Sequence, residues 1–287
     1  MGWVDPQDSS LITIYVHGFS NDEDKATQRW QIDIWPVIKR LISRPTCDVM
    51  LFFWPSDADI TKVFSAGDYP HRVETAISAG AELAEYLWRI SDEGNPKLRV
   101  QLVGHSLGCR VVLSAVQHLA ERPQKVPVER VLLMGAAVPE GDCTGSGPWP
   151  AKVSELFNAP PGQRSAENCD VILYSRDDEI LKGKFLYGEQ KARQKGVGSS
   201  DSPAVGLTGG PGDPGKERWT GEVAPCGLKH GDYLVKPSAL RYVAAMVGQL
   251  VDRPMPERPQ GQRALDERQP GKRPLASRFA SSMRRLS

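Results

Sequence analysis

The sequence predicts an α/β fold in which a mostly parallel central sheet carries helices on both of its faces. Short apolar runs alternate with amphipathic stretches along most of the chain, and this order is typical of a parallel sheet covered by helices. The apolar runs are continuous, which indicates strands buried on both faces. With 287 residues, 40% of them hydrophobic and 25% charged, the chain can form one sizeable core.

The first predicted strand covers residues 11–16 (LITIYV), a short apolar run that is rich in β-branched residues. Asn21 and Asp22 then provide capping side chains for a helix over about residues 24–41. A second apolar run at 47–54 (CDVMLFFW) predicts the next strand. Strand, helix and strand in this order begin the predicted parallel sheet.

The same alternation continues along the rest of the chain. Apolar residues in steps of three and four predict a helix over residues 71–90. Its predicted buried stripe is Val73, Ile77, Ala81, Ala84 and Trp88. Further apolar runs predict strands at 98–103, 130–134 and 171–174. Two more helical stripes predict one helix that begins after Gly108 and a last helix over 238–251.

Two segments depart from this pattern. Residues 197–219 are rich in Gly, Pro and Ser and predict a long loop. Residues 252–287 contain nine basic and four acidic residues, a net charge of +5, and few apolar ones. We expect one folded domain over 1–252 and a disordered basic, Pro- and Arg-rich tail over 253–287. The alternative for the tail is a basic amphipathic helix that contacts a membrane surface.

Composition excludes several classes of function. The formal net charge of +1 gives no electrostatic basis for binding nucleic acid. The five cysteines form no CxxC pair, so we expect free thiols in a reducing compartment and no zinc site. No run approaches the roughly 20 apolar residues that span a bilayer, and the first residues do not resemble a signal peptide. A cytoplasmic protein is therefore expected.

A serine between two glycines is the first candidate for chemistry. Residues 104–108 read GHSLG, and they follow a predicted strand and precede a predicted helix. A nucleophile elbow has this context, a sharp strand-to-helix turn with the serine at its tip. Glycines allow such a bend, and the helix N-terminus brings backbone N–H groups to the site. Ser106 is the predicted nucleophile, and an ordinary glycine-rich turn is the alternative.

A serine needs a base that takes its proton. The five histidines are His17, His71, His105, His118 and His230. In enzymes with a nucleophile elbow the histidine follows the serine in the chain, which leaves the last two. His118 is predicted on the helix after the elbow, roughly 18 Å along the axis from Ser106, and cannot reach it. His230 remains as the predicted base, and a solvent-exposed loop histidine is the alternative.

The acid that orients this histidine should follow the predicted strand at 171–174. Asp178 is the first choice in the segment after that strand, and Asp177 and Glu179 are the alternatives. The non-catalytic interpretation is that the neighbouring acids are solvated charges of a surface loop.

Two backbone N–H groups are predicted to stabilise the charge that develops on a substrate oxygen. One belongs to Leu107, the residue after the nucleophile, and the other to Phe19 in the loop after the first strand. His17 lies at the end of that strand. We interpret it as an architectural residue whose ring packs against the loop and hydrogen-bonds it.

Several short motifs together resemble the α/β-hydrolase superfamily. They are V-H-G-F at 16–19, W-P-S at 54–56, G-H-S-L-G at 104–108, L-L-M-G-A-A at 132–137, Y-S-x-x-D-x-I-L at 174–181 and H-x-x-Y at 230–233. In combination they look like α/β-hydrolase families of unknown function, over about residues 11–251. The resemblance implies the α/β-hydrolase fold with the triad Ser106, Asp178 and His230, and it favours Asp178 over Asp177. No insertion like a lipase lid is found, so no large lid domain is expected.

The resemblance and the candidate residues together predict a serine hydrolase whose catalytic domain is residues 1–252. The expected reaction is cleavage of a carboxylic ester through an acyl-enzyme, without metal or cofactor, in the manner of a carboxylesterase or lipase. The expected partner is a small-molecule ester or an acyl-lipid. The alternatives are a lipase, phospholipase or thioesterase acting on acyl-lipids or thioesters, cleavage of an amide, and a catalytically silent binding scaffold.

Overall fold

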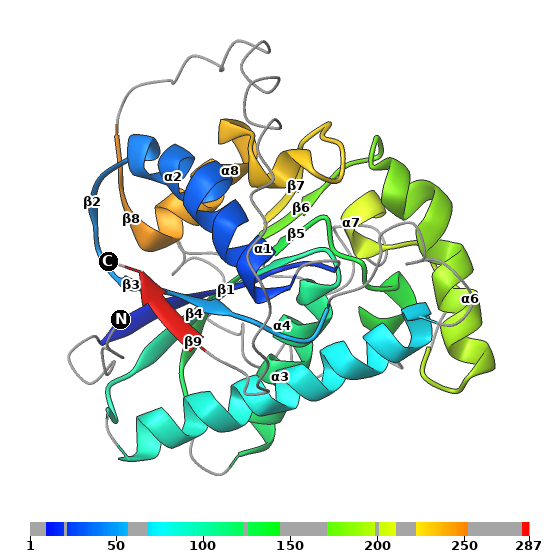
Figure 1. Cartoon of the computed structure of the whole chain (residues 1–287), viewed down its shortest axis with the longest axis horizontal. Coiled ribbons are helices and arrows are strands. Elements are labelled where there is room, and N and C mark those ends of the chain that lie inside the picture. Colours follow the sequence, from blue (N-terminus) through cyan, green and yellow to red (C-terminus); the bar gives the residue numbers. More distant parts are fainter. Residues whose placement is uncertain are drawn as a thin grey trace.

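The computed structural model confirms the predicted fold class, a mostly parallel sheet with helices on both faces (Figure 1). The structure describes residues 10–19, 22–56, 68–93, 95–122, 126–143, 171–198, 201–210, 222–251 and 283–286. Residue Asn21, expected to contribute to a helix cap, lies outside these ranges. Asp22 lies within them and caps the first helix, because its carboxylate accepts the Lys25 N–H at 2.7 Å.

Seven strands form the main sheet in the order β7-β6-β5-β4-β1-β3-β9. They are β1 (Leu11–Val16), β3 (Asp48–Phe52), β4 (Arg99–His105), β5 (Val128–Met134), β6 (Val171–Tyr174), β7 (Glu222–Pro225) and β9 (Met283–Leu286). All neighbouring pairs are parallel except β3 and β9, which are antiparallel. The five strands predicted from apolar runs are therefore all present, at nearly the predicted positions.

Helices cover both faces of this sheet (Figure 1). On one face lie α1 (Glu23–Arg29), η2 (Trp30–Ile34), α2 (Trp35–Leu41) and α8 (Pro237–Val247). On the other lie α3 (Asp68–Glu93), α4 (Gly108–Glu121) and α6 (Leu186–Gln194). Shorter helical segments are η3 (Glu140–Cys143), η5 (Ile180–Phe185), α7 (Val205–Thr208) and η6 (Asp232–Leu234). None of the helices described is long and apolar enough to cross a membrane.

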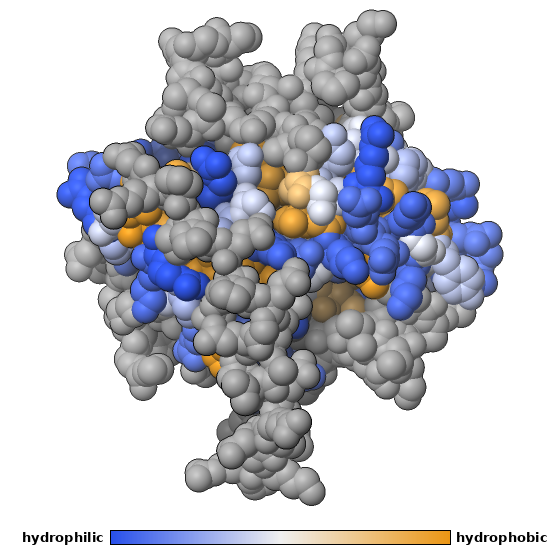
Figure 2. All heavy atoms as spheres, turned by 90° about the horizontal axis from the view of Figure 1, so that it is seen from above, coloured by the Kyte–Doolittle hydropathy of each residue, from blue (hydrophilic) through white to orange (hydrophobic). Residues whose placement is uncertain are grey.

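Alternate residues of β1 enter two different apolar cores, which explains its continuous apolar sequence. Ile12, Ile14 and Val16 belong to the core beneath α3 and α4, whereas Tyr15 belongs to the core beneath α1, α2 and α8. Polar residues predominate at the right-hand end of the described surface in Figure 2, with some apolar residues among them. Helix α6, which lies at that end in Figure 1, exposes Leu186 and Tyr187.

The end of the last predicted helix is a strand. Helix α8 stops at Val247, and β8 (Gly248–Leu250) pairs antiparallel with β2 (Ile42–Pro45). A Cβ at Gly248 would lie 2.5 Å from the Arg44 carbonyl oxygen. The glycine therefore permits the close approach that lets the chain leave the helix and pair with β2.

The predicted long loop at 197–219 contains an ordered turn in its described part. Helix α7 lies there. Its residue Gly206 connects the segments that follow β5 and β6 through two hydrogen bonds of 3.0 Å. The Gly206 N–H donates to the Ala136 carbonyl, and the Gly206 carbonyl accepts the Ser175 N–H. Residues 199–200 and 211–219 of this loop lie outside the described residues. The loop therefore helps to fix the segments that follow β5 and β6.

The described end of the tail differs from the predicted disorder and from the alternative helix. Residues 283–286 form β9, which pairs with β3 from Phe52↔Met283 to Val49↔Leu286. Without β9, β3 would expose one row of backbone N–H and C=O groups, and such an edge readily pairs with a free segment. Residues 252–282 and 287 lie outside the described residues.

Candidate active site

Ser106 lies at the tip of a sharp turn between β4 and α4. Its φ of 55° is the only positive value at a non-glycine residue in the described part of the chain. Such a conformation costs on the order of 1–3 kcal/mol. Hydrogen bonds hold it, since the Ser106 N–H donates to the Met134 carbonyl at 3.0 Å and its carbonyl accepts from Ala137 and Cys109 at 3.1 Å. The turn has the geometry of a nucleophile elbow.

The two glycines of GHSLG are required by close packing. A Cβ at Gly108 would lie 2.4 Å from the His17 carbonyl oxygen, and one at Gly104 would lie 2.9 Å from the Cys109 Cα. Neither glycine is among the residues with a positive φ. The bend expected of the glycines is therefore made by Ser106 itself, while the glycines let α4 begin directly against the ends of β1 and β4.

His230 connects Ser106 to an acid. Its Nε2 lies 2.8 Å from the Ser106 Oγ, and its Nδ1 lies 2.7 Å from the Asp178 Oδ2. A neutral ring satisfies both contacts when Nδ1–H donates to the carboxylate and Nε2 accepts the hydroxyl proton. Asp232 stabilises the loop that carries His230, because its carboxylate accepts the Lys229 N–H at 3.2 Å.

Asp178 is fully buried at the turn that follows β6. Its Oδ1 accepts the N–H groups of Ile180 and Leu181 at 3.1 Å each, which leaves Oδ2 for His230. The alternatives Asp177 and Glu179 are exposed on the surface. The structure thus brings Asp178 into line with His230 and Ser106, and such a line can move a proton from the hydroxyl to the ring.

The two predicted N–H donors lie on the two segments that meet at Ser106. Leu107 begins the turn into α4, and its N–H makes no hydrogen bond within the described residues. Gly18, which precedes Phe19, lies so close that a Cβ on it would be 3.0 Å from the Ser106 Cβ. The loop after β1 therefore lies against the serine, as its predicted role requires.

His105 is a contact residue of the site that the sequence did not single out. Its ring is buried, and its Nε2 lies 3.1 Å from the His230 carbonyl oxygen. Burial and the neighbouring His230 hold the pKa of His105 well below its ordinary value, so the ring is neutral and can donate to that carbonyl. The sequence contained a signal for this role, because His105 directly precedes Ser106 in GHSLG, and a residue next to the elbow serine lies at the site.

His17 and His118 have surroundings separate from His230. His17 is buried, and its Nδ1 lies 2.9 Å from the Gly18 carbonyl oxygen, so its ring does bond the loop, as expected. His118 lies on the surface of α4, where its Nδ1 is 3.5 Å from Glu121. Neither has a hydrogen bond to Ser106 among the contacts of the described residues.

No group of three or more His, Cys, Asp or Glu side chains that could hold a metal ion occurs in the described ranges. The cysteines found there are free thiols, namely Cys47, Cys109, Cys143 and Cys226. The fifth, Cys169, lies outside the described residues.

Solved structures resemble this chain at low sequence identity. YbtT, a type II thioesterase from the yersiniabactin pathway, is 12% identical, with a TM-score of 0.40 over 84% of this chain and 93% of its own. A putative hydrolase of the α/β superfamily from Xanthomonas campestris is 19% identical, with a TM-score of 0.35 over 81% and 95%. A poly(3-hydroxybutyrate) depolymerase from Bordetella parapertussis is 14% identical, with a TM-score of 0.36 over 82% and 77%. Likeness at this level does not identify a substrate.

A search of curated proteins finds no match to this chain. A family model matches residues 4–182, more than half of the 287 residues, and the match contains Ser106 and Asp178. The model describes α/β hydrolases, which agrees with the observed sheet and elbow. The chain therefore belongs to the family of α/β hydrolases of unknown function designated DUF900.

Proposed function

We propose that this chain is a serine hydrolase that cleaves carboxylic esters through an acyl-enzyme intermediate. The observation that carries the proposal is the line of two hydrogen bonds, 2.7 and 2.8 Å long, from Asp178 through His230 to Ser106. The left-handed backbone of Ser106 supports it, since strain of this kind is concentrated at functional sites.

In the first half of the reaction, the Ser106 Oγ attacks the ester carbonyl carbon and gives its proton to the His230 Nε2. Asp178 accepts the Nδ1–H of the resulting imidazolium and stabilises its charge. The carbonyl oxygen becomes an oxyanion, to which Leu107 and Phe19 donate their backbone N–H groups. The C–O bond then breaks, and the alcohol leaves with the proton from His230.

In the second half, water replaces the alcohol. His230 takes a proton from the water, whose oxygen attacks the acyl carbon. The bond to the Ser106 Oγ breaks, and the serine recovers its proton from His230. The products are a carboxylic acid and the free enzyme, so the cycle needs no reagent besides the ester and water.

The proposal predicts that Ser106→Ala abolishes hydrolysis. Loss of the nucleophile should lower kcat by a factor on the order of 10⁴ or more, and a fluorophosphonate probe should label the unaltered protein but not the variant. Ser114→Ala is the matched control, because Ser114 is also buried but lies within α4, where its hydroxyl donates to the Ile77 carbonyl at 2.8 Å. We expect the control to be labelled like the unaltered protein.

The same protein should be tested on p-nitrophenyl esters of rising chain length beside a thioester and an anilide. Faster turnover of the esters supports the proposed bond. Preference for the thioester or for long acyl chains would instead assign a thioesterase or a lipase, and preference for the anilide would assign an amidase. Equal labelling of the unaltered protein and Ser106→Ala would contradict the role of Ser106. No labelling and no hydrolysis would indicate a scaffold without activity.

A further inference from the structure

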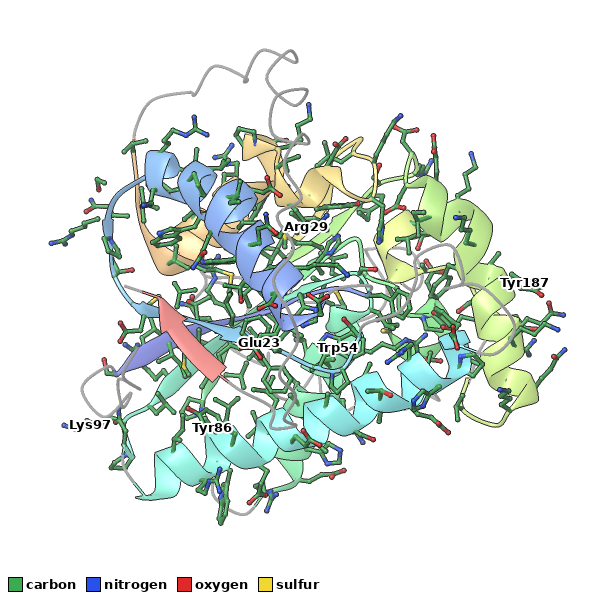
Figure 3. The ribbon with its side chains drawn as sticks, viewed as in Figure 1. Glu23, Arg29, Trp54, Tyr86, Lys97 and Tyr187 are labelled. Atoms are coloured by element: carbon green, nitrogen blue, oxygen red, sulfur yellow. The ribbon has the colours of Figure 1, made fainter. Side chains whose placement is uncertain are left out.

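Two motifs of the sequence, V-H-G-F at 16–19 and W-P-S at 54–56, lie outside the line of three side chains. The structure brings them together, because β1 and β3 are adjacent and parallel and Val16 pairs with Phe52. The residues that follow the two strands therefore lie side by side at the carboxyl edge of the sheet. Trp54 lies inside the fold at this place (Figure 3).

Trp54 fixes both the position and the protonation of His17. Its backbone N–H donates to the His17 Nε2 at 3.3 Å, and its indole N–H donates to the His17 carbonyl at 2.8 Å. Since a backbone N–H can only donate, Nε2 is an acceptor, and a neutral ring then carries its proton on Nδ1. Burial lowers the pKa of His17 to about 4, which agrees with a neutral ring.

The carbonyl of Gly18 accepts two hydrogen bonds from these motifs. The His17 Nδ1–H donates to it at 2.9 Å, and the hydroxyl of the buried Ser56 donates to it at 3.2 Å. The described residues contain no cis peptide bond, so the Gly18–Phe19 peptide is trans and planar. In such a peptide the C=O and N–H groups point in opposite directions. Fixing the Gly18 carbonyl therefore fixes the direction of the Phe19 N–H.

We propose that Ser56 and His17 are positioning residues that hold the Gly18–Phe19 peptide so that the Phe19 N–H points at the oxyanion formed on Ser106. The inference rests on the proposed function, because it assigns to W-P-S a role in that reaction. Neither side chain touches the substrate. Each acts through the peptide. The Gly18 Cα lies against Ser106, because a Cβ at Gly18 would be 3.0 Å from the Ser106 Cβ.

The effect of losing Ser56 should be seen in the transition state. An oxyanion donor contributes a factor on the order of 10²–10³ to kcat. Ser56 supplies one hydrogen bond to the Gly18 carbonyl and also lies 3.3 Å from the His17 Nδ1, so Ser56→Ala should lower kcat by about tenfold, the equivalent of one net hydrogen bond. KM should change little, because the ground-state ester carries no negative charge on its oxygen.

The test compares Ser56→Ala with Ser114→Ala, since both variants remove a buried hydroxyl that donates to a backbone carbonyl. Two quantities are measured: kcat and KM for a p-nitrophenyl ester that the unaltered protein cleaves, and the inhibition constant of an aryl trifluoromethyl ketone. This ketone forms an anionic tetrahedral adduct with a serine, so its binding reports on the oxyanion donors. We expect Ser56→Ala to lose about tenfold in both kcat and ketone affinity, and Ser114→Ala to lose neither. Thermal unfolding should show both variants destabilised, because each loses a buried hydrogen bond.

The outcomes separate this inference from the proposed function. If the unaltered protein is active, Ser106→Ala is inactive and Ser56→Ala behaves like Ser114→Ala, the inference is wrong while the function stands. If the unaltered protein is neither labelled nor active, both are wrong. Should Ser56→Ala fail to fold, Ser56→Cys gives the same comparison, because a thiol nearly preserves the volume but is a weak donor.

Discussion

Two buried histidines, His105 next to Ser106 and His17 in the loop after β1, are kept neutral by their surroundings. The His17 ring already accepts the Trp54 N–H, so a proton on its Nε2 would place two donors face to face. His105 lies against His230, with ring centres 5.1 Å apart. A charged His105 would oppose the imidazolium that His230 must become in the proposed reaction. Neutral rings at these positions are therefore part of the electrostatics of the site.

The stability of the protein should consequently fall as pH decreases from about 6.5 to 4. The pKa of His17 is about 4 in the folded chain and about 6.5 when unfolded. Between these values the unfolded chain binds more protons, so stability rises with pH. His17 alone should account for a loss of about 3 kcal/mol once pH falls below its folded pKa. Urea unfolding of the unaltered protein and of His17→Gln across this range measures the difference in slope.

His118→Gln is the control for this measurement, because the His118 side chain is 41% exposed. We expect its curve of unfolding free energy against pH to run parallel to that of the unaltered protein. The interpretation of His17 would be contradicted if His17→Gln also gave a parallel curve.

At the residue scale, the sequence predicted the residues whose signals are local. Ser106 stands in a five-residue pattern, and His230 is the one histidine after it that can reach it. Asp178 and Asp177 are neighbours in the same turn, so the resemblance was the main reason for choosing Asp178. Ser56 lies 38 residues from Gly18 in the chain, and their contact depends on the pairing of β1 with β3. Such a contact cannot be inferred from local pattern.

At the scale of the elements, the predicted helices are present but the face that α3 buries differs. Val73 and Ala84 of its predicted stripe are buried, whereas Ile77, Ala81 and Trp88 are only partly so. The residues that replace them in the core include Ala76, Leu83 and Leu87. Gly80 explains the rotation, since a Cβ there would lie 2.4 Å from the Ser114 Cβ on α4. Hydropathy assigns no weight to a glycine, although it marks the line where two helices meet.

A buried charge network connects three helices behind the elbow. Arg110 of α4 pairs with Glu189 of α6, and Tyr69 of α3 donates its hydroxyl to the same carboxylate at 2.6 Å. The Arg110 Nε–H also donates to the Ala137 carbonyl at 3.0 Å. Burial alone would lower the pKa of Arg110, but Glu189, Tyr69 and Asp142 raise it above its ordinary value. The network fixes α6, which follows the turn of Asp178, against the helix that follows Ser106.

Removing one partner should therefore destabilise the fold strongly. Arg110→Met or Glu189→Leu leaves a buried charge without its partner, which costs about 3–5 kcal/mol. The double variant should cost less than the sum of the two, by about 2 kcal/mol, because neither charge of the Arg110–Glu189 pair remains. The buried Asp142, 3.8 Å from Arg110, loses this partner in Arg110→Met and in the double variant alike, so its cost does not enter the difference. Chemical denaturation of the three variants measures this coupling.

The exposed pair of Arg99 and Glu129, with an N–O distance of 2.7 Å, is the control for this network. Arg99→Met should cost at most about 1 kcal/mol, as surface ion pairs contribute little. Additive costs for Arg110→Met and Glu189→Leu would show that the buried contacts are not coupled.

At the scale of the whole molecule, the chain closes one edge of its own sheet. Figure 1 shows β9 beside β3, at the opposite end of the sheet from β7. β3 leads directly into Trp54 and Ser56, so the strand covered by β9 also carries residues that hold the Gly18 loop. The polar composition that predicted a disordered tail does not exclude this pairing, because edge strands are held by backbone hydrogen bonds.

Deleting residues 283–287 should therefore destabilise the fold and expose the edge of β3. The loss should be on the order of 2 kcal/mol, the net contribution of a few backbone hydrogen bonds, and the free edge should promote association between copies. Denaturation measures the first effect, and light scattering at rising protein concentration measures the second.

Arg284→Gln combined with Arg285→Gln is the control, because it removes the charges but keeps the backbone that pairs with Leu51 and Met50. If the double substitution reproduced the deletion, the tail would act through its charge; if neither changed stability or association, β9 would not protect this edge in solution.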